Sequence, residues 1–222
     1  MLAKLFDWGK RSGPSAPFYR PYKEQAADFL YNLLFCDNPD LYRNGKQSEG
    51  PLGTVLSGAA TLESLEEIAV DPAVESRVRM LAFNHLRGMN VPTPAKQLLG
   101  TIIEFPQDGG LDTLAAFADG RVRYINQTGK PAIFERAPPE VLAKANELIR
   151  VSQPAVDRHG PSDEPRRPPP AGDVVRLSFL VSDGLYFGEG SYEVLMDDAE
   201  GEPVLTVGGE LLVRLVDTVV GT

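Results

Sequence analysis

Residues that commonly carry catalysis are scarce in this sequence. Its 222 residues include one cysteine, Cys36, and two histidines, His85 and His159. A single cysteine forms no disulfide within the chain, and the N-terminal stretch lacks the long apolar core of a signal peptide, so we expect a cytoplasmic location. Two imidazoles and one thiol, far apart in the sequence, predict neither a transition-metal site nor a bound cofactor.

None of these three side chains has the surroundings that catalysis requires. Cys36 stands at the C-terminal end of a predicted helix, where the helix dipole disfavours a thiolate, so we expect a buried structural thiol. His85 falls on the apolar side of another predicted helix, which favours a structural role. His159 lies in a proline-rich stretch that does not hold a base at a fixed distance from a substrate. The sequence therefore predicts no catalytic residue, and whether the protein is an enzyme stays open.

Long apolar runs and a surplus of positive charge are also absent. The apolar runs are far shorter than the ~18 residues that a membrane-spanning helix needs. The 31 acidic and 22 basic residues give a formal charge of −9, which repels phosphate backbones unless a basic face is segregated. We therefore expect neither a transmembrane segment nor nucleic-acid binding.

Turn chemistry and strand pattern agree between residues 97 and 152. Asp119-Gly120 and Thr128-Gly129 each separate two short runs of strand-forming residues, and glycine allows the positive φ of a tight hairpin turn. An amphipathic helix follows over residues 138–152, so this unit is predicted to be an antiparallel meander covered by one helix. The pattern places its strands at 98–105, 111–117, 121–126 and 132–134.

A similar order of signals returns between residues 173 and 222. A helix over about 210–220 follows four predicted strands, at 174–181, 185–187, 192–196 and 204–207. This order suggests an internal duplication of the first unit, although such turns are common in any meander. Between the units, residues 153–172 contain six prolines and are predicted to form an exposed linker, with an SH3-type ligand as the alternative.

The first part of the chain is predicted to be helical. Residues 1–20 form an arm in which Leu2, Leu5 and Phe6 share one side of a short amphipathic helix. We favour an arm that is docked or frayed, and a membrane-surface or partner-binding anchor is the alternative. Residues 21–90 are predicted to be a helical segment. The expected fold is therefore α+β, with this segment followed by two antiparallel four-strand-plus-helix units that form one sheet or two.

Two stretches resemble segments of an uncharacterised family of bacterial cytosolic proteins. They are LYNLLFCDNPDLYR, at residues 30–43, and FADGRVRYINQTGK, at residues 117–130. The resemblance implies a bacterial, cytosolic origin. It implies no particular fold or activity.

One polar cluster suggests a binding site, and it lies in the hairpin after Asp119. Arg121 and Arg123 share one face of an extended strand, where guanidinium groups pair well with carboxylates. This favours an acidic protein surface as the partner, and a solvent-facing strand with edge-protecting charges is the alternative. The whole predicted site comprises Arg121, Arg123, Tyr124, Asn126 and Lys130.

Two function classes remain after these exclusions. The first is a non-enzymatic interaction protein, an adaptor or a neutralising protein, which the basic hairpin favours. The second is a small hydrolase that uses carboxylates in the turns of the sheet. Two carboxyl groups with strongly perturbed pKa in one pocket would favour the hydrolase. Arginines bound to carboxylates of their own molecule would indicate that the hairpin is structural.

Overall fold

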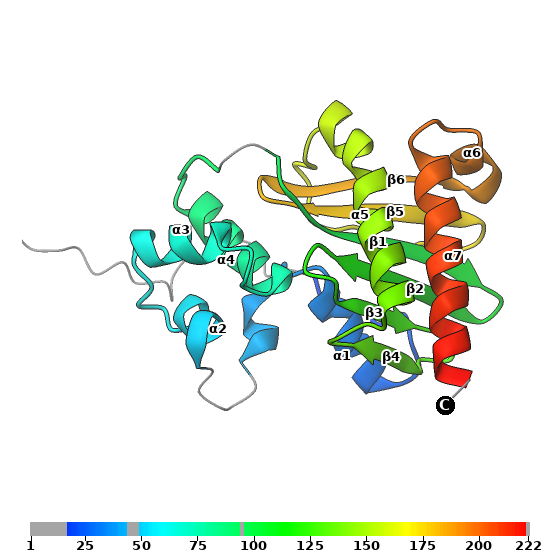
Figure 1. Ribbon diagram of the computed structural model, residues 1–222, viewed down its shortest axis with the longest axis horizontal. Coiled ribbons are helices and arrows are strands. Elements are labelled where there is room, and N and C mark those ends of the chain that lie inside the picture. Colours follow the sequence, from blue (N-terminus) through cyan, green and yellow to red (C-terminus); the bar gives the residue numbers. More distant parts are fainter. Residues whose placement is uncertain (1–16, 44–48, 94–95, 221–222) are drawn as a thin grey trace, which may run out of the picture.

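A computed structural model describes residues 17–43, 49–93 and 96–220 of the chain (Figure 1). The amphipathic stretch expected within residues 1–16, with the membrane or partner anchor proposed for it, lies outside the described residues. Within the described ranges the chain forms one six-stranded antiparallel sheet with helices on both faces. The fold is therefore α+β, as the sequence predicts.

Both halves of the chain contribute strands to this sheet. The order across it is β4-β3-β2-β1-β5-β6, and each neighbouring pair is antiparallel. Gly120 and Gly129 have φ of +82° and +83°, so the two tight turns form where glycine alone is unstrained. The strands are β1 (Leu98–Gln107), β2 (Gly110–Phe117), β3 (Val122–Ile125), β4 (Pro131–Phe134), β5 (Val174–Val181) and β6 (Gly184–Ser191).

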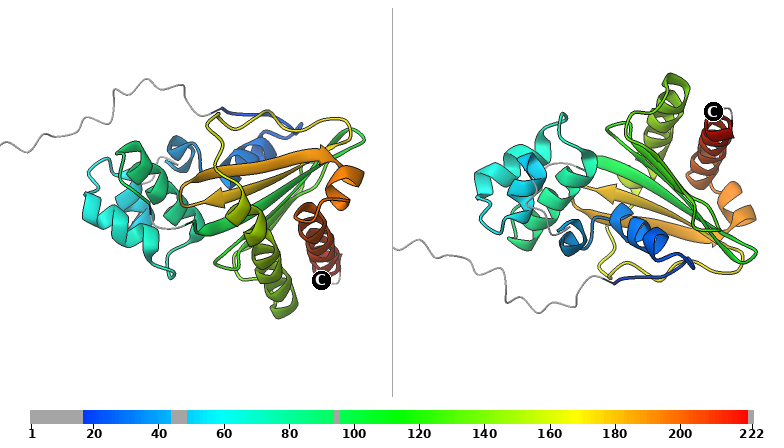
Figure 2. Two further views of the ribbon diagram at one scale, coloured as in Figure 1. Left: turned by 90° about the horizontal axis from the view of Figure 1, so that it is seen from above. Right: turned by 90° about the horizontal axis from the view of Figure 1, so that it is seen from below.

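Two long helices cover one face of the sheet. They are α5 (Pro139–Arg158) and α7 (Gly201–Val220), which pack side by side (Figures 1 and 2). Because side chains alternate along a strand, every second residue of β1, β2 and β5 meets these helices. The resulting core includes Ile103, Leu114, Leu148, Leu177 and Leu211.

The remaining helices pack on the opposite face and at one end of the sheet. Figure 2 shows α1 (Gln25–Leu34) on the face away from α5 and α7. A 3-10 helix, η2 (Pro39–Tyr42), leads to α2 (Gly50–Leu56), α3 (Leu62–Val70) and α4 (Ser76–Gly88), which gather at the end of the sheet. Their shared core includes Tyr31, Phe83, Ile102, Phe117 and Leu180.

In the second half of the chain, the predicted strands at 174–181 and 185–187 and the helix over 210–220 are confirmed by β5, β6 and α7, but two other strand predictions fail. Residues 192–196 form α6 (Tyr192–Met196) and residues 204–207 belong to α7, so both strand predictions are wrong. Capping side chains start these helices, because Ser191 Oγ accepts a hydrogen bond from Val194 N and Asp198 Oδ1 accepts one from Gly201 N. Burial of a stripe at helical spacing outweighs the strand propensity of the valines. The predicted second four-strand unit, and with it the duplication, is not formed.

The proline-rich stretch begins inside a helix and then crosses the sheet. α5 continues to Arg158, six residues into the predicted linker. We call residues 160–172 the strap. Ser162 N donates a hydrogen bond to Leu185 O of β6 (2.8 Å), and Arg166 has only 6% of its surface exposed. The expectation of an exposed linker is therefore wrong at Arg166, which inserts its side chain between the strap and α1.

Candidate functional site

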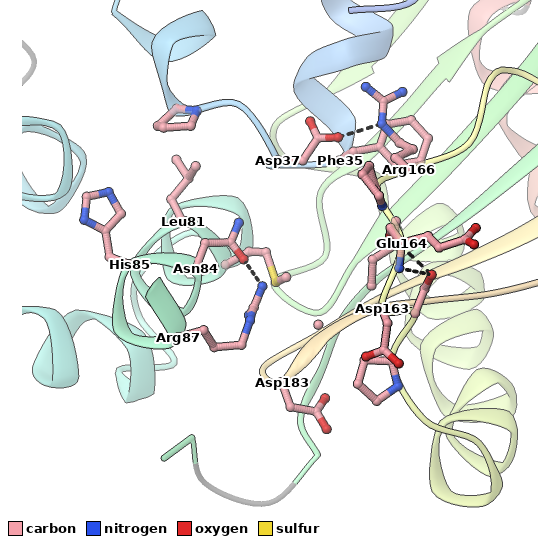
Figure 3. A pocket seen from close by; sticks show the side chains of 17 residues that line it. Phe35, Asp37, Leu81, Asn84, His85, Arg87, Asp163, Glu164, Arg166 and Asp183 are labelled. Atoms are coloured by element: carbon pink, nitrogen blue, oxygen red, sulfur yellow. Dashed lines mark hydrogen bonds and ion pairs between the residues drawn. The ribbon is translucent and has the colours of Figure 1, made fainter. Parts of the chain in front are cut away.

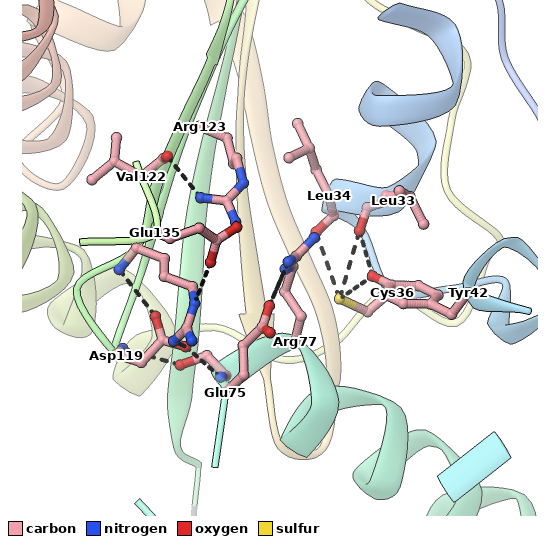
Figure 4. Close-up of polar contacts among 12 residues, drawn as sticks. Leu33, Leu34, Cys36, Tyr42, Glu75, Arg77, Asp119, Val122, Arg123 and Glu135 are labelled. Atoms are coloured by element: carbon pink, nitrogen blue, oxygen red, sulfur yellow. Dashed lines mark hydrogen bonds and ion pairs between the residues drawn. The ribbon is translucent and has the colours of Figure 1, made fainter. Parts of the chain in front are cut away.

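The two arginines of the predicted site contact carboxylates of their own molecule (Figure 4). Arg121 lies 3.0 Å from Asp119 Oδ2 and 2.8 Å from Glu135 Oε2. Arg123, only 5% exposed, donates to Glu135 Oε1 and to the backbone oxygen of Val122. The guanidinium groups thus share Glu135 of their own molecule. This is the arrangement expected of structural arginines.

The other residues of the predicted site have contacts of their own. Tyr124 OH donates to Asp112 Oδ1 (3.1 Å) on the far face of the strand. Asn126 Oδ1 accepts from Thr128 N and Lys130 N, both at 3.0 Å, and so stabilises the turn. The side chain of Lys130 is exposed. The structure therefore does not bring the five predicted residues together at one surface.

Asp119 joins the sheet to the helical segment (Figure 4). Ser76 N, at the start of α4, donates to Asp119 Oδ2 (2.6 Å), and Asp119 N donates to Ser76 Oγ (3.1 Å). Asp119 therefore caps a helix that belongs to a distant part of the chain.

Nearby, burial raises the pKa of the Cys36 thiol to about 12. A thiol of that pKa is protonated near neutral pH, so Cys36 is not a nucleophile.

A cavity of about 490 Å³ lies between α4, the strap and the turn that joins β5 to β6 (Figure 3). Arg87 Nη1 donates to Ser182 O (2.9 Å). Asp37 Oδ1, Arg166 Nη1 and Asp183 Oδ1 have no hydrogen-bond partner among the described residues. These atoms carry opposite charges, and Figure 3 places Asp37 and Asp183 at opposite ends of the cavity. One charged group of a ligand would not contact all of these atoms at once, so the cavity suits solvent.

Arg166 fastens the strap at the edge of this cavity. Its Nε donates to Asp37 Oδ2 (2.7 Å), and its Nη2 donates to Asn32 Oδ1 (2.8 Å) and to Pro17 O (3.0 Å). The guanidinium carbon lies 4.1 Å from the centre of the Phe35 ring. The geometry is that of a buried structural ion pair with an aromatic face beneath it.

The carboxyl groups of raised pKa do not lie together. Glu104 of β1 is fully buried, and burial raises its pKa although Tyr31 OH donates to it (2.6 Å). Burial also raises the pKa of Asp37, in the cavity of Figure 3. Of the two groups, only Asp37 borders that cavity.

A second cavity, of about 320 Å³, is lined by carboxylates whose pKa values are lowered, not raised. Burial opposes the ionisation of Glu189, but hydrogen bonds from Arg176 and Arg167 outweigh it and lower the pKa. Backbone N–H groups of Gly201 and Glu200 lower the pKa of Asp198. Glycoside hydrolysis requires a carboxylic acid that stays protonated beside a carboxylate. The condition favouring the hydrolase is two carboxyl groups of strongly perturbed pKa in one pocket. Glu189 and Asp198 do line the second cavity together, but both pKa values are lowered, so the pair supplies no protonated acid.

An apolar groove runs between α7 and the face of β1, β2 and β3. Its cavity has a volume of about 270 Å³, and only Gln107 and Asp112 add polar side chains other than tyrosine. The rings of Phe105 and Tyr192 meet edge to face, 5.8 Å apart. We call this surface the α7 groove, and define it by Ile103, Phe105, Tyr124, Tyr192, Gly209 and Leu212.

The lip of the α7 groove leaves large apolar side chains in solvent. Tyr192 is 47% exposed, and on the outer side of α7 Val213 and Val216 are 58% and 46% exposed. Side chains three and four residues apart share one side of a helix, so Gly209, Val213 and Val216 continue the apolar surface along α7. Clustered exposed apolar residues of this kind mark interaction surfaces more often than isolated ones do.

Close packing explains one of the two neighbouring glycines of α7 but not the other. A Cβ atom on Gly208 would lie 2.3 Å from Ile103 Cδ1, so close packing explains this glycine. A Cβ atom on Gly209 would meet nothing within 4 Å. A glycine inside a helix costs roughly 0.5–1 kcal/mol relative to alanine. Folding therefore gives no reason for Gly209, which leaves open space at the groove.

Sequence reasoning missed the α7 groove because it assigned Tyr192 to a strand. The detectable signal was in α7, where Val213 lies outside the buried stripe formed by Leu211 and Leu215. An apolar residue on the wrong side of an amphipathic helix indicates a second apolar contact. The glycine pair inside a helix was the other signal.

Further searches add no ligand or relative. No group of three or more histidine, cysteine, aspartate and glutamate side chains is arranged to hold a metal ion in the part of the chain that the structure describes. Among the described helices, none has the length and apolarity to cross a membrane. Comparison with protein-family models, curated proteins and solved structures gives no match to this chain.

Proposed function

We propose that the protein is a non-enzymatic interaction protein, an adaptor or a neutralising protein, whose partner binds in the α7 groove. The supporting observation is an apolar cavity with solvent-exposed aromatic and valine side chains at its lip. Its volume, about 270 Å³, lies below the ~300–1,000 Å³ of typical small-molecule pockets. It suits one large side chain of a partner, the kind of anchor that carries much of the energy of an interface.

The proposal moves the partner site away from the hairpin of Arg121 and Arg123. It keeps the sequence-based expectations of a bacterial, cytoplasmic protein that does not bind nucleic acid. A catalytic function has less support, because Asp37 and Glu189, two cavity carboxylates of shifted pKa, form ion pairs with arginines of the same chain. Cys36 and Glu104 are buried away from any substrate.

Co-purification of tagged full-length protein from its native host, followed by mass spectrometry, tests the proposal. Val216→Glu places a charge on the exposed apolar surface of α7 that continues from the groove, without changing a buried residue. The matched control is Val70→Glu, because Val70 is 55% exposed at the end of α3, remote from α7. A stoichiometric partner that wild type and the control retain, and that Val216→Glu loses, would support the proposal. Equal partner recovery by all three proteins would contradict it.

A further inference from the structure

We infer that the partner of the α7 groove is an amphipathic helix with basic flanks, which inserts one large apolar side chain beside Gly209. This inference rests on the proposed function and specifies the chemistry of the partner. It follows from the shape of the groove, from the unexplained glycine and from the charges around the lip.

The shape of the groove favours a helix as the occupant. One wall is the helix α7 and the other is the sheet face, so an element that enters the groove packs against both. An amphipathic helix fits such a groove with apolar side chains at positions i, i+3, i+4 and i+7. A partner strand would instead need a free sheet edge, and the groove lies on the face of β1, β2 and β3, not at an edge.

Gly209 marks the place of closest approach. Small residues at a helix crossing let the two backbones come nearer than larger side chains permit. Gly209 faces open space and lines the groove together with Tyr192 and Leu212. A large side chain of the partner would fill this space. Its presence there would explain a glycine that weakens the helix in the unbound protein.

The charges around the groove favour a basic partner. Asp112 lines the groove. Among the exposed sequence neighbours of the lip residues, Glu193 and Asp217 are acidic and Arg214 is basic. No lysine or arginine lines the groove within the described ranges. The chain as a whole carries a formal charge of −9, so its field attracts a basic segment and repels an acidic one. The same net negative charge disfavours a second copy of this chain as the occupant.

Three synthetic helical peptides, each of about fourteen residues or four turns, test the inference against full-length protein. The first has leucines and one phenylalanine on a single side and lysines elsewhere. The second keeps that apolar side and replaces the lysines with glutamates. The third keeps the lysines and replaces the apolar side with alanines. Fluorescence anisotropy gives each affinity, and NMR amide shifts locate the bound peptide.

We expect the lysine-flanked apolar peptide to bind and to shift amides of α7 and β3. The glutamate-flanked peptide should bind at least about ten-fold more weakly, and the alanine peptide should not bind. Gly209→Leu, which fills the groove, should weaken binding of the first peptide about ten-fold or more. Val70→Glu, remote from the groove, should leave its affinity unchanged.

Each contrary result has a separate meaning. Equal affinity of the lysine and glutamate peptides at the α7 groove would overturn the basic partner and leave the proposed function standing. Binding elsewhere, or no binding of any peptide, would overturn the helical partner. A wild-type dimer that Val216→Glu dissociates, seen by analytical ultracentrifugation, would assign the groove to a second copy. Stronger peptide binding by Phe6→Glu would assign it to the chain's own N-terminal residues. Either assignment also overturns the inference.

Discussion

Replacement of Arg166 by alanine should destabilise the protein far more than replacement of its neighbour, Arg167. Arg166 is buried and makes three hydrogen bonds through its guanidinium group, to Asp37, Asn32 and Pro17. Truncation leaves the partially buried Asp37 without its counter-charge. Breaking a buried ion pair in this way costs about 3–5 kcal/mol, a large part of the ~5–15 kcal/mol that typically separates folded from unfolded protein.

Arg167 provides the matched control because its side chain is 44% exposed and its ion pair with Glu189 lies at the surface. Surface pairs contribute about 0–1 kcal/mol, so Arg167→Ala should lower the free energy of unfolding by no more than that. Arg166→Lys should recover only part of the loss, since lysine keeps the charge but lacks the planar fork and the stacking on Phe35.

Urea unfolding followed by circular dichroism measures all three variants. Limited proteolysis adds a local observation, because release of the strap should expose residues 160–172 to cleavage before the sheet unfolds. The reasoning would be refuted if Arg166→Ala and Arg167→Ala had equal midpoints and equal cleavage patterns. That result would mean that the strap is held by its backbone contacts and not by the arginine.

Three further substitutions test other parts of the structure. Asp119→Ala removes the cap of α4 and should cost about 1–2 kcal/mol in urea unfolding, against little change for Asp108→Ala in the exposed β1–β2 turn; equal costs would count against the cap. Burial raises the pKa of Glu104 above its usual 4.5, so its contribution to stability is full below that value and is lost as pH rises through the raised pKa. As pH rises from about 4.5, wild type should therefore lose stability that Glu104→Gln keeps, so the free energy of unfolding of the variant minus that of wild type should increase. A decrease of this difference would show that the ion pair with Arg176 dominates. Gly209→Ala should raise the free energy of unfolding by roughly 0.5–1 kcal/mol while it weakens partner binding, and a destabilised variant would mean that Gly209 has a structural role.

The meander of β1 to β4 could be predicted because its information is local. Glycines at Asp119-Gly120 and Thr128-Gly129 fix the turns, and the alternation between them fixes the strands. The helix after Pro138 also has a local signal, its apolar stripe. These elements appear in the structure close to their predicted positions.

In the second half, the strands at 174–181 and 185–187 and the helix over 210–220 were predicted correctly. Residues 192–196 and 204–207 were mispredicted because local and distant information conflict there. The valines of α7 favour a strand on propensity alone, yet Val204 and Leu211 recur at helical spacing and are buried against the sheet. Burial across the whole stripe outweighs the small propensity of each residue. Prediction from pattern fails when two periods fit the same apolar residues.

The predicted site failed for a different reason. Arg121 and Arg123 are adjacent on one strand face, as alternation requires, but the pairing of β3 with β4 brings Glu135 to them. The partner of Arg166, Asp37, lies 129 residues away in the sequence. Contacts of this range depend on topology, and a single sequence does not specify which charges meet.

Site-specific photo-cross-linking tests the central claim most directly, namely that a partner occupies the α7 groove. A photoreactive amino acid at position 213 faces outward from the groove lip, and one at position 70 occupies an equally exposed site remote from it. In cells of the native host, we predict a cross-linked partner at position 213 and none at position 70. Cross-linking at both positions alike, or a partner captured only at position 70, would contradict the account.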